Sequence, residues 1–385
     1  MKIVGRRFIT LGACVGVLLA SRLVLSHETT TTTVLFDREV VRILDQHCVM
    51  CHSDGAISFP LSTYEQTWLR GRSIRAEVLR RHMPPWAAIP GYGDFANDNS
   101  LTLREVQFMV SWVEGLGPRN AGTVFLNVQD PGARPPQEVR AQAHTGHWQL
   151  GQPAVTRTLS SNAIQSDQAD HVRRVVVDTG LQTERRVRAV EYVPGDRRVV
   201  RAAFFTVQET GQWLGSWTPW YAYTLLPAGT SYRLPAGSHI VAEIHYRGVK
   251  EAVSDQGTLG LFFADQPTTS SVSDLVLEAK GDVAAGAASQ RFRAERRLTT
   301  NISALALRQE TLSGIQSIEV SAKRADGSTQ VLLFARDFPI AWPSPFIFKE
   351  PVRLPAGTVL AVTAYYANPS AMPQPGGIRL TISRY

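Results

Sequence analysis

Residues 48–52 read Cys-Val-Met-Cys-His, and this run decides how the first third of the chain is interpreted. Two thiols three residues apart at the end of a short helix can each add to a haem vinyl group, and the adjacent imidazole then lies under the iron. We therefore interpret Cys48 and Cys51 as the covalent attachment points of one haem c, with His52 as an axial ligand of the iron.

Three other interpretations of this run compete with haem attachment. A thioredoxin-like redox pair needs a βαβ context, and a zinc site needs further Cys or His residues at suitable spacing; neither pattern is present. A chance occurrence of the motif is the third alternative.

The sequence around the motif has helical periodicity. Helices are expected over residues 36–44, 64–81 and 102–116. Thr102 and Glu105 have the spacing of a capping box at the start of the third helix, and Gly115 and Gly117 are stop signals at its end. Three helices around this motif predict a small all-α cytochrome c domain over residues 33–118.

An electron-carrying haem also needs a sixth iron ligand, and Met83 is the best candidate. It lies in the run His-Met-Pro-Pro-Trp at residues 82–86, where two prolines end the second helix and stiffen the loop. The alternatives are His82 and Met109. The latter falls on the apolar stripe of the third helix, where a core role is expected.

Two weaker predictions concern the surroundings of the haem. The carbonyl of Pro60 could accept a hydrogen bond from the free ring N–H of His52 and so orient the imidazole. Trp86, Tyr92 and Phe95 could wall the distal face of the haem, although aromatic residues in a small domain usually belong to its core.

The first 26 residues have the layout of an export signal, with basic residues followed by an apolar run over residues 9–20. Arg6 and Arg7 resemble a twin-arginine signal, and a Sec signal is the alternative. We expect a periplasmic protein whose signal is cleaved near Ser26, or one that keeps this segment as a membrane anchor. Of the three cysteines only Cys14 lies in this segment, so both cysteines of the exported chain belong to the haem motif.

The net charge gives no sign of a nucleic-acid partner. The formal charge of the whole chain is +7, and four of its basic residues lie in the first 26 residues, where no acidic residue occurs. Removing those four charges from +7 leaves +3 for the remainder. A remainder so close to neutral offers no basic stripe, and we therefore expect no nucleic-acid binding.

The sequence changes character after a Pro- and Gly-rich stretch at residues 119–147, which we interpret as a linker. Short alternating runs separated by turn residues then dominate, and they predict antiparallel β-sandwiches. Strands are expected over residues 174–178, 187–193, 199–207, 239–245, 258–263, 317–322, 330–335, 358–365 and 378–383.

Several of these segments together resemble a known family. They are the haem segment through Met-Pro-Pro-Trp at 83–86, Trp-Gln-Leu-Gly at 148–151, Leu-Pro-Ala-Gly-Ser at 234–238 and Ile-His-Tyr at 244–246. The chain resembles bacterial fusions of cytochrome c with a copper type II, ascorbate-dependent monooxygenase-like region, similar to peptidylglycine α-hydroxylating monooxygenase. The resemblance implies two consecutive jelly-roll-like sandwiches, over residues 148–270 and 271–385.

The copper ligands that this resemblance implies are largely missing. In the family one copper is held by a His-His pair and a strand histidine, the other by His-x-His and a methionine. His245 matches the strand histidine, but residues 201–202 are Arg-Ala where the pair is expected, residues 303–308 contain no histidine, and only Met372 follows later. A redox copper site needs two or three converging ligands, so we expect no copper and a structural role for His245.

These observations favour an exported mono-haem cytochrome that transfers electrons. Its degenerate monooxygenase-like sandwiches would dock or position it beside a redox protein partner, which could belong to a membrane-associated complex. We expect no catalytic residues. A copper-dependent oxidoreductase fed by the haem and a structural accessory subunit remain the alternatives.

Overall fold

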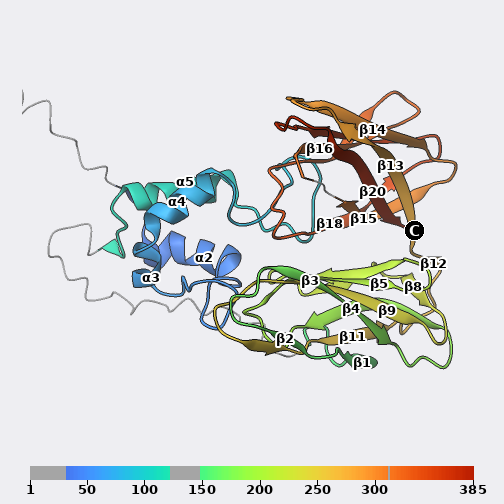
Figure 1. Cartoon of the computed structure of the whole chain (residues 1–385), viewed down its shortest axis with the longest axis horizontal. Helices are drawn as coiled ribbons and strands as arrows, with labels where there is room; N and C mark the ends of the chain where they lie inside the picture. Colours follow the sequence, from blue (N-terminus) through green and yellow to red (C-terminus); the bar gives the residue numbers. More distant parts are fainter. Residues whose placement is uncertain (1–31, 122–147, 311–312) are drawn as a thin grey trace, which may run out of the picture.

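The structure is a computed structural model of the 385-residue chain, and it describes residues 32–121, 148–310 and 313–385. Helices gather at one end of the molecule and two β-sandwiches lie at the other (Figure 1). The expected export segment, and all but the start of the expected linker, lie outside the described residues. Among the described helices, none is long and apolar enough to cross a membrane.

The helical region follows the predicted pattern with one break. The helices are η1 (Phe36–Val40, a π-helix), α2 (Val41–His47), α3 (Tyr64–Trp68), α4 (Gly71–Leu79) and α5 (Leu103–Glu114). The prediction of a single helix over residues 64–81 is therefore wrong in one respect. The segment forms two helices, which are separated by Leu69 and Arg70. Thr63 and Gln66 cap the short α3, and Gly71, a weak helix former, opens α4.

The predicted capping box at the start of α5 is confirmed. The backbone N–H of Glu105 donates to Thr102 Oγ1 at 3.2 Å, and the N–H of Thr102 donates to Glu105 Oε2 at 2.7 Å. The helices share one apolar core, in which Phe36 packs against Tyr64 and Trp112 at ring distances of 5.3 and 5.9 Å. Met109 is buried in this core, as its place on the apolar stripe predicted.

The first sandwich consists of two main sheets and a small hairpin. One sheet has the order β1-β11-β4-β8-β12 with β7 added on β4, and the other has the order β3-β9-β5-β6. The strands are β1 (Val155–Thr158), β3 (His171–Asp178), β4 (Arg185–Val193), β5 (Val200–Val207), β6 (Trp213–Trp217), β7 (Tyr223–Leu225), β8 (Thr230–Leu234), β9 (His239–Tyr246), β11 (Thr258–Phe263) and β12 (Ser270–Ser271), with β2 (Asn162–Ile164) and β10 (Val253–Asp255) as the hairpin. Apolar side chains from both sheets fill the space between them.

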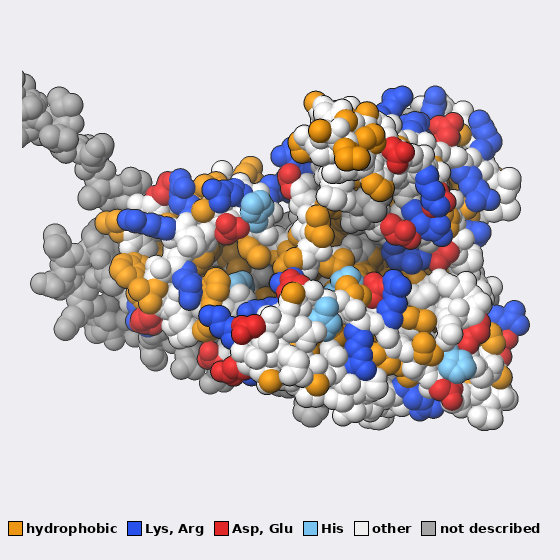
Figure 2. Space-filling view, viewed as in Figure 1, with side chains coloured by type: hydrophobic (Ala, Val, Ile, Leu, Met, Phe, Trp, Pro, Cys, Tyr) orange, Lys and Arg blue, Asp and Glu red, His pale blue; other side chains and the backbone are white. Residues whose placement is uncertain are grey.

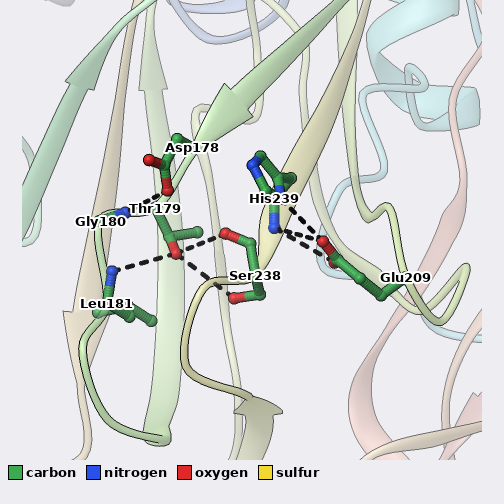
Figure 3. A network of polar contacts seen from close by, with 7 residues as sticks. All are labelled: Asp178, Thr179, Gly180, Leu181, Glu209, Ser238 and His239. Carbon is green, nitrogen blue, oxygen red and sulfur yellow. Dashed lines mark hydrogen bonds and ion pairs between the residues drawn. The ribbon is translucent and has the colours of Figure 1, made fainter.

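One end of the second of these sheets is closed by side-chain hydrogen bonds (Figure 3). Thr179, just after β3, donates from Oγ1 to the carbonyl of Ser238 at 2.6 Å. Beside it, Glu209 accepts from the backbone N–H of His239 at 3.0 Å and contacts its Nδ1 at 2.9 Å. The contacts tie the turn before β9 to its neighbours, so we assign these residues a structural role.

The second sandwich has two four-stranded sheets, ordered β13-β20-β15-β18 and β14-β19-β16-β17. Its strands are β13 (Ser273–Val283), β14 (Gln290–Arg297), β15 (Ile302–Glu310), β16 (Ile315–Lys323), β17 (Thr329–Arg336), β18 (Phe346–Leu354), β19 (Val359–Tyr366) and β20 (Gln374–Arg384). The neighbouring strands pair antiparallel, and a large apolar cluster fills the interior. The predicted β-sandwich class is confirmed, and every expected strand is present.

The loop after the helical region is built into the second sandwich. Ala88 forms an isolated bridge with Ala335 of β17, and Phe95 forms one with Phe348 of β18. Trp86 and Phe95 belong to the apolar core of that sandwich. The segment that carries Met83 therefore continues directly into the β-structure of the second sandwich.

Candidate functional site

The proposed attachment motif forms a tight turn at the end of α2. Cys48 is the C-cap residue of this helix, and its carbonyl accepts hydrogen bonds from the N–H groups of Cys51 at 3.0 Å and His52 at 2.9 Å. This turn places two thiols and an imidazole on consecutive positions of one short segment. Neither thiol is in a disulfide.

The environment of the thiols differs from that of a redox-active cysteine pair. Burial raises the pKa of both Cys48 and Cys51 to about 12. A reactive pair of the thioredoxin kind needs the opposite shift, because the thiolate is the nucleophile. In the part of the chain that the structure describes, no three or more His, Cys, Asp or Glu side chains are grouped to share a metal ion.

The imidazole of His52 is held in one orientation by the backbone. Its Nδ1 lies 2.9 Å from the carbonyl oxygen of Phe59. A carbonyl can only accept, so Nδ1 carries the proton and Nε2 keeps its lone pair. Burial and the charge of Arg70 lower the pKa of His52, although the Phe59 hydrogen bond opposes them, so the ring stays neutral at neutral pH.

The carbonyl that accepts the hydrogen bond from His52 belongs to Phe59 and not, as expected from the sequence, to Pro60. Two hydrogen bonds that close the loop explain the difference: Ser58 N–H donates to the carbonyl of Cys51 at 2.9 Å, and Leu61 N–H donates to that of His52 at 2.7 Å. The ring of Phe59 also lies against the imidazole, with centroids 4.6 Å apart. Neutral thiols and a neutral imidazole with a free Nε2 fit a c-type haem.

Met83, the expected sixth ligand, is exposed and lines a small apolar cavity of about 260 Å³. Val78, Leu101 and Val106 also line this cavity, whereas the residues of the attachment motif do not. The neighbouring His82 is exposed, and its Nδ1 lies 3.2 Å from Glu77 Oε2. The structure therefore places Met83 at an apolar surface and His82 in a solvent-exposed contact with Glu77.

The aromatic residues after Met83 mainly contact the second sandwich. Trp86 packs edge-on against Phe346 at a ring distance of 5.3 Å, and it also lines the cavity beside Met83. Phe95 stacks on Phe348 at 5.2 Å. Tyr92 packs edge-on against Phe334 at a ring distance of 5.6 Å. Their role is to anchor the loop, and of the three only Trp86 lines the Met83 cavity.

A residue that the sequence analysis did not single out contacts the attachment motif. Arg197 lies in the loop between β4 and β5, and its Nη2 donates to the carbonyl of Met50 at 3.2 Å. Met50 stands between the two cysteines, so this arginine reaches the motif from the first sandwich. No local pattern could have revealed the contact, because it joins residues 147 positions apart.

A cavity of about 670 Å³ lies between the two sandwiches, and the recess is visible in Figure 2. The sheet β3-β9-β5-β6 forms one wall, with Arg174, Glu243 and His245. Strands β15 and β18 contribute Arg308 and Phe346 on the other side. Trp86 lines this cavity as well as the one beside Met83, so it lies between them.

The histidine that matches the family's strand ligand is hydrogen-bonded in this wall. His245 Nε2 lies 3.0 Å from Glu243 Oε1, and Arg174 Nη2 lies 2.7 Å from Glu243 Oε2. The hydrogen bonds from His245 and Arg174 lower the pKa of Glu243 to about 2, although its partial burial opposes them. Glu243 thus serves both neighbours as a fixed negative charge.

Comparison with known proteins shows no close relative. No protein-family model matches the chain, and no curated protein matches it. Among solved structures, that of Sulfolobus turreted icosahedral virus aligns with a TM-score of 0.20 and 9% identity, over 58% of this chain and 59% of that one. This chain therefore spans about three fifths of that neighbour's length.

Two further solved structures are similarly distant. The infectious bursal disease virus Gx strain has a TM-score of 0.18 and 11% identity, over 59% of this chain and 70% of that one. The mavirus major capsid protein has a TM-score of 0.18 and 8% identity, over 62% of this chain and 88% of that one. These alignments are too weak to bear on function.

Proposed function

We propose that the chain is an exported mono-haem c-type cytochrome that transfers single electrons. The observation that carries the proposal is the orientation of His52, whose Nδ1 is fixed by the Phe59 carbonyl while Nε2 keeps a free lone pair. Cys48 and Cys51 precede it in the same turn as unpaired, neutral thiols. A haem bound there supplies an iron that exchanges one electron at a time.

We propose that Met83 would hold the haem iron as its second protein ligand, through its thioether sulfur. Its side chain lies at an apolar cavity, and the loop that follows it is anchored in the second sandwich through Trp86. A thioether ligand favours the ferrous state and suits an electron carrier. Met109 is less suitable because it is fully buried in the helical core.

We further propose that the chain is a cytochrome c fusion of the copper monooxygenase-like type whose sandwiches have lost their copper ligands. Arg201, which stands in place of the first histidine of the expected pair, forms an ion pair with Asp170 at 2.5 Å. Residues 304–307 in β15, where His-x-His is expected, are buried apolar side chains. The sandwiches then serve to dock a redox protein partner in the periplasm, and near-stoichiometric copper in the purified chain would contradict this.

A redox titration of the full chain, matured in a host that attaches haem c, tests the electron-transfer function. We expect one reversible transition that fits a single electron, and its loss in the variant His52→Ala. A haem-loaded chain that shows no reversible transition would overturn the proposal. Turnover of an organic substrate with consumption of oxygen would point to an enzyme instead.

A further inference from the structure

The first sandwich contributes a charged side chain to the proposed haem site. Arg197 is half-buried, and its guanidinium donates to the carbonyl of Met50 at 3.2 Å, at the peptide between the two cysteines. This contact places the arginine beside the attachment motif.

The loop that carries Arg197 is held rigidly. The N–H of Asp196 donates to Asp255 Oδ1 at 2.8 Å, and the hydroxyl of Tyr246 donates to Asp255 Oδ2 at 2.8 Å. Asp255 is almost completely buried, so it fixes the loop from inside the sandwich. Gly195 packs so tightly that an added Cβ would lie 2.5 Å from the backbone nitrogen of Gln256. A preorganised loop of this kind loses little entropy in presenting its side chain.

We propose that Arg197 is a positioning residue of the haem site, which fixes the attachment turn and raises the reduction potential of the haem. This inference rests on the proposed function. A fixed positive charge beside the motif favours the reduced iron, which carries one positive charge less than the oxidised iron. Because the guanidinium is half-buried, water and salt screen it less than a surface charge. The arginine remains protonated at any working pH.

The adjacent Arg198 offers a matched control for this proposal. It lies on the same loop and carries the same charge, but it is exposed and forms an ion pair with Asp196 at 2.6 Å. No hydrogen bond from Arg198 to residues 48–52 occurs among the described contacts. Its charge is paired locally and screened by solvent, so its removal should act weakly on a haem held at Cys48 and Cys51.

The decisive experiment is a set of midpoint potentials for the full, haem-loaded chain. For Arg197→Gln we expect a lower potential, corresponding to a three- to tenfold shift of the one-electron equilibrium toward the oxidised haem, where tenfold is about 59 mV. Arg197→Lys should stay near the wild-type value because it keeps the charge. Arg198→Gln should also stay near the wild-type value. An unchanged potential in Arg197→Gln, or an equal drop in Arg198→Gln, would overturn the inference.

Two further measurements separate the possible failures. If the wild-type chain carries no covalent haem, the proposed function itself is wrong. If its haem content is normal and Arg197→Gln leaves the midpoint potential unchanged, only the role of the arginine is wrong. If Arg197→Gln does not mature, Arg197→Met keeps the apolar stem in place and provides a second neutral side chain. Failure of Arg197→Lys to mature along with both neutral variants would contradict the proposal, because the arginine would then serve folding alone.

Discussion

At the scale of single residues, the account depends on side chains that neighbouring groups hold in one state. His52 is fixed by the carbonyl of Phe59, at a distance of 2.9 Å. Glu243 is fixed by His245 and Arg174, at 3.0 and 2.7 Å. Each contact determines which atoms stay available for chemistry. His52 keeps Nε2 free, whereas the ring of His245 is engaged by a carboxylate.

The proposed sulfur ligand can be tested by removing it. We expect the variant Met83→Ala to retain covalent haem but to lose the weak absorption band at the red end of the visible spectrum that sulfur-ligated ferric haem gives. The matched variant Met109→Leu should keep the band, since Met109 belongs to the core. Survival of the band in Met83→Ala, together with its loss in Met109→Leu, would assign the ligand to Met109 in α5 instead.

The Glu243 contacts predict a pH-dependent contribution to stability. The pKa of this carboxyl falls from 4.5 to about 2 in the folded chain, so its contribution is complete above pH 4.5 and is lost as the pH falls toward 2. We expect Glu243→Gln to lower the free energy of unfolding by on the order of 2 kcal/mol at pH 7, and by progressively less below pH 4.5. Denaturant unfolding of both chains across this range measures the difference, and a constant difference would contradict the assignment.

At the scale of elements, the periodic segments could be predicted and the aperiodic ones could not. Helix α5 and the alternating strand β9 have their pattern in the sequence itself. Strand β6 was not predicted because all five of its residues are buried, which removes the alternation. The break between α3 and α4 was missed because apolar periodicity continues across it.

The capping box of α5 gives a prediction at this scale. Replacing Thr102 with Ala removes the oxygen that accepts from the N–H of Glu105, and this should lower the free energy of unfolding by about 1 kcal/mol. The variant Thr102→Ser keeps the hydroxyl and should lie close to the wild type. Thermal unfolding of the three chains measures both effects, and equal stability of Thr102→Ala and the wild type would show that the cap contributes nothing.

At the scale of the whole molecule, the candidate haem site is assembled from parts that lie far apart in the sequence. The attachment turn belongs to the helical region, Arg197 comes from the first sandwich, and the loop of Met83 is anchored in the second through Trp86. The sequence predicted the Cys-x-x-Cys-His run and the methionine as candidates, because each has a local signature. It could not predict Arg197 or the carbonyl of Phe59, since tertiary packing alone brings them to the site.

In the proposed function the sandwiches have a role that needs no copper chemistry. Trp86 lies between the Met83 cavity and the cleft of about 670 Å³ between the sandwiches. A change in the packing of the sandwiches would therefore shift Trp86, and through the loop that joins them it would alter the position of Met83. Docking of a redox partner on the sandwiches is compatible with such a connection.

The most direct test of the central claim is the haem content of the full chain, matured in a host that attaches haem c. The pyridine haemochrome spectrum of the denatured protein should show one haem c per chain. This haem should remain bound after extraction with acidic organic solvent, and it should be absent from a chain with both Cys48→Ala and Cys51→Ala. A chain that emerges from such a host without covalent haem would contradict the account.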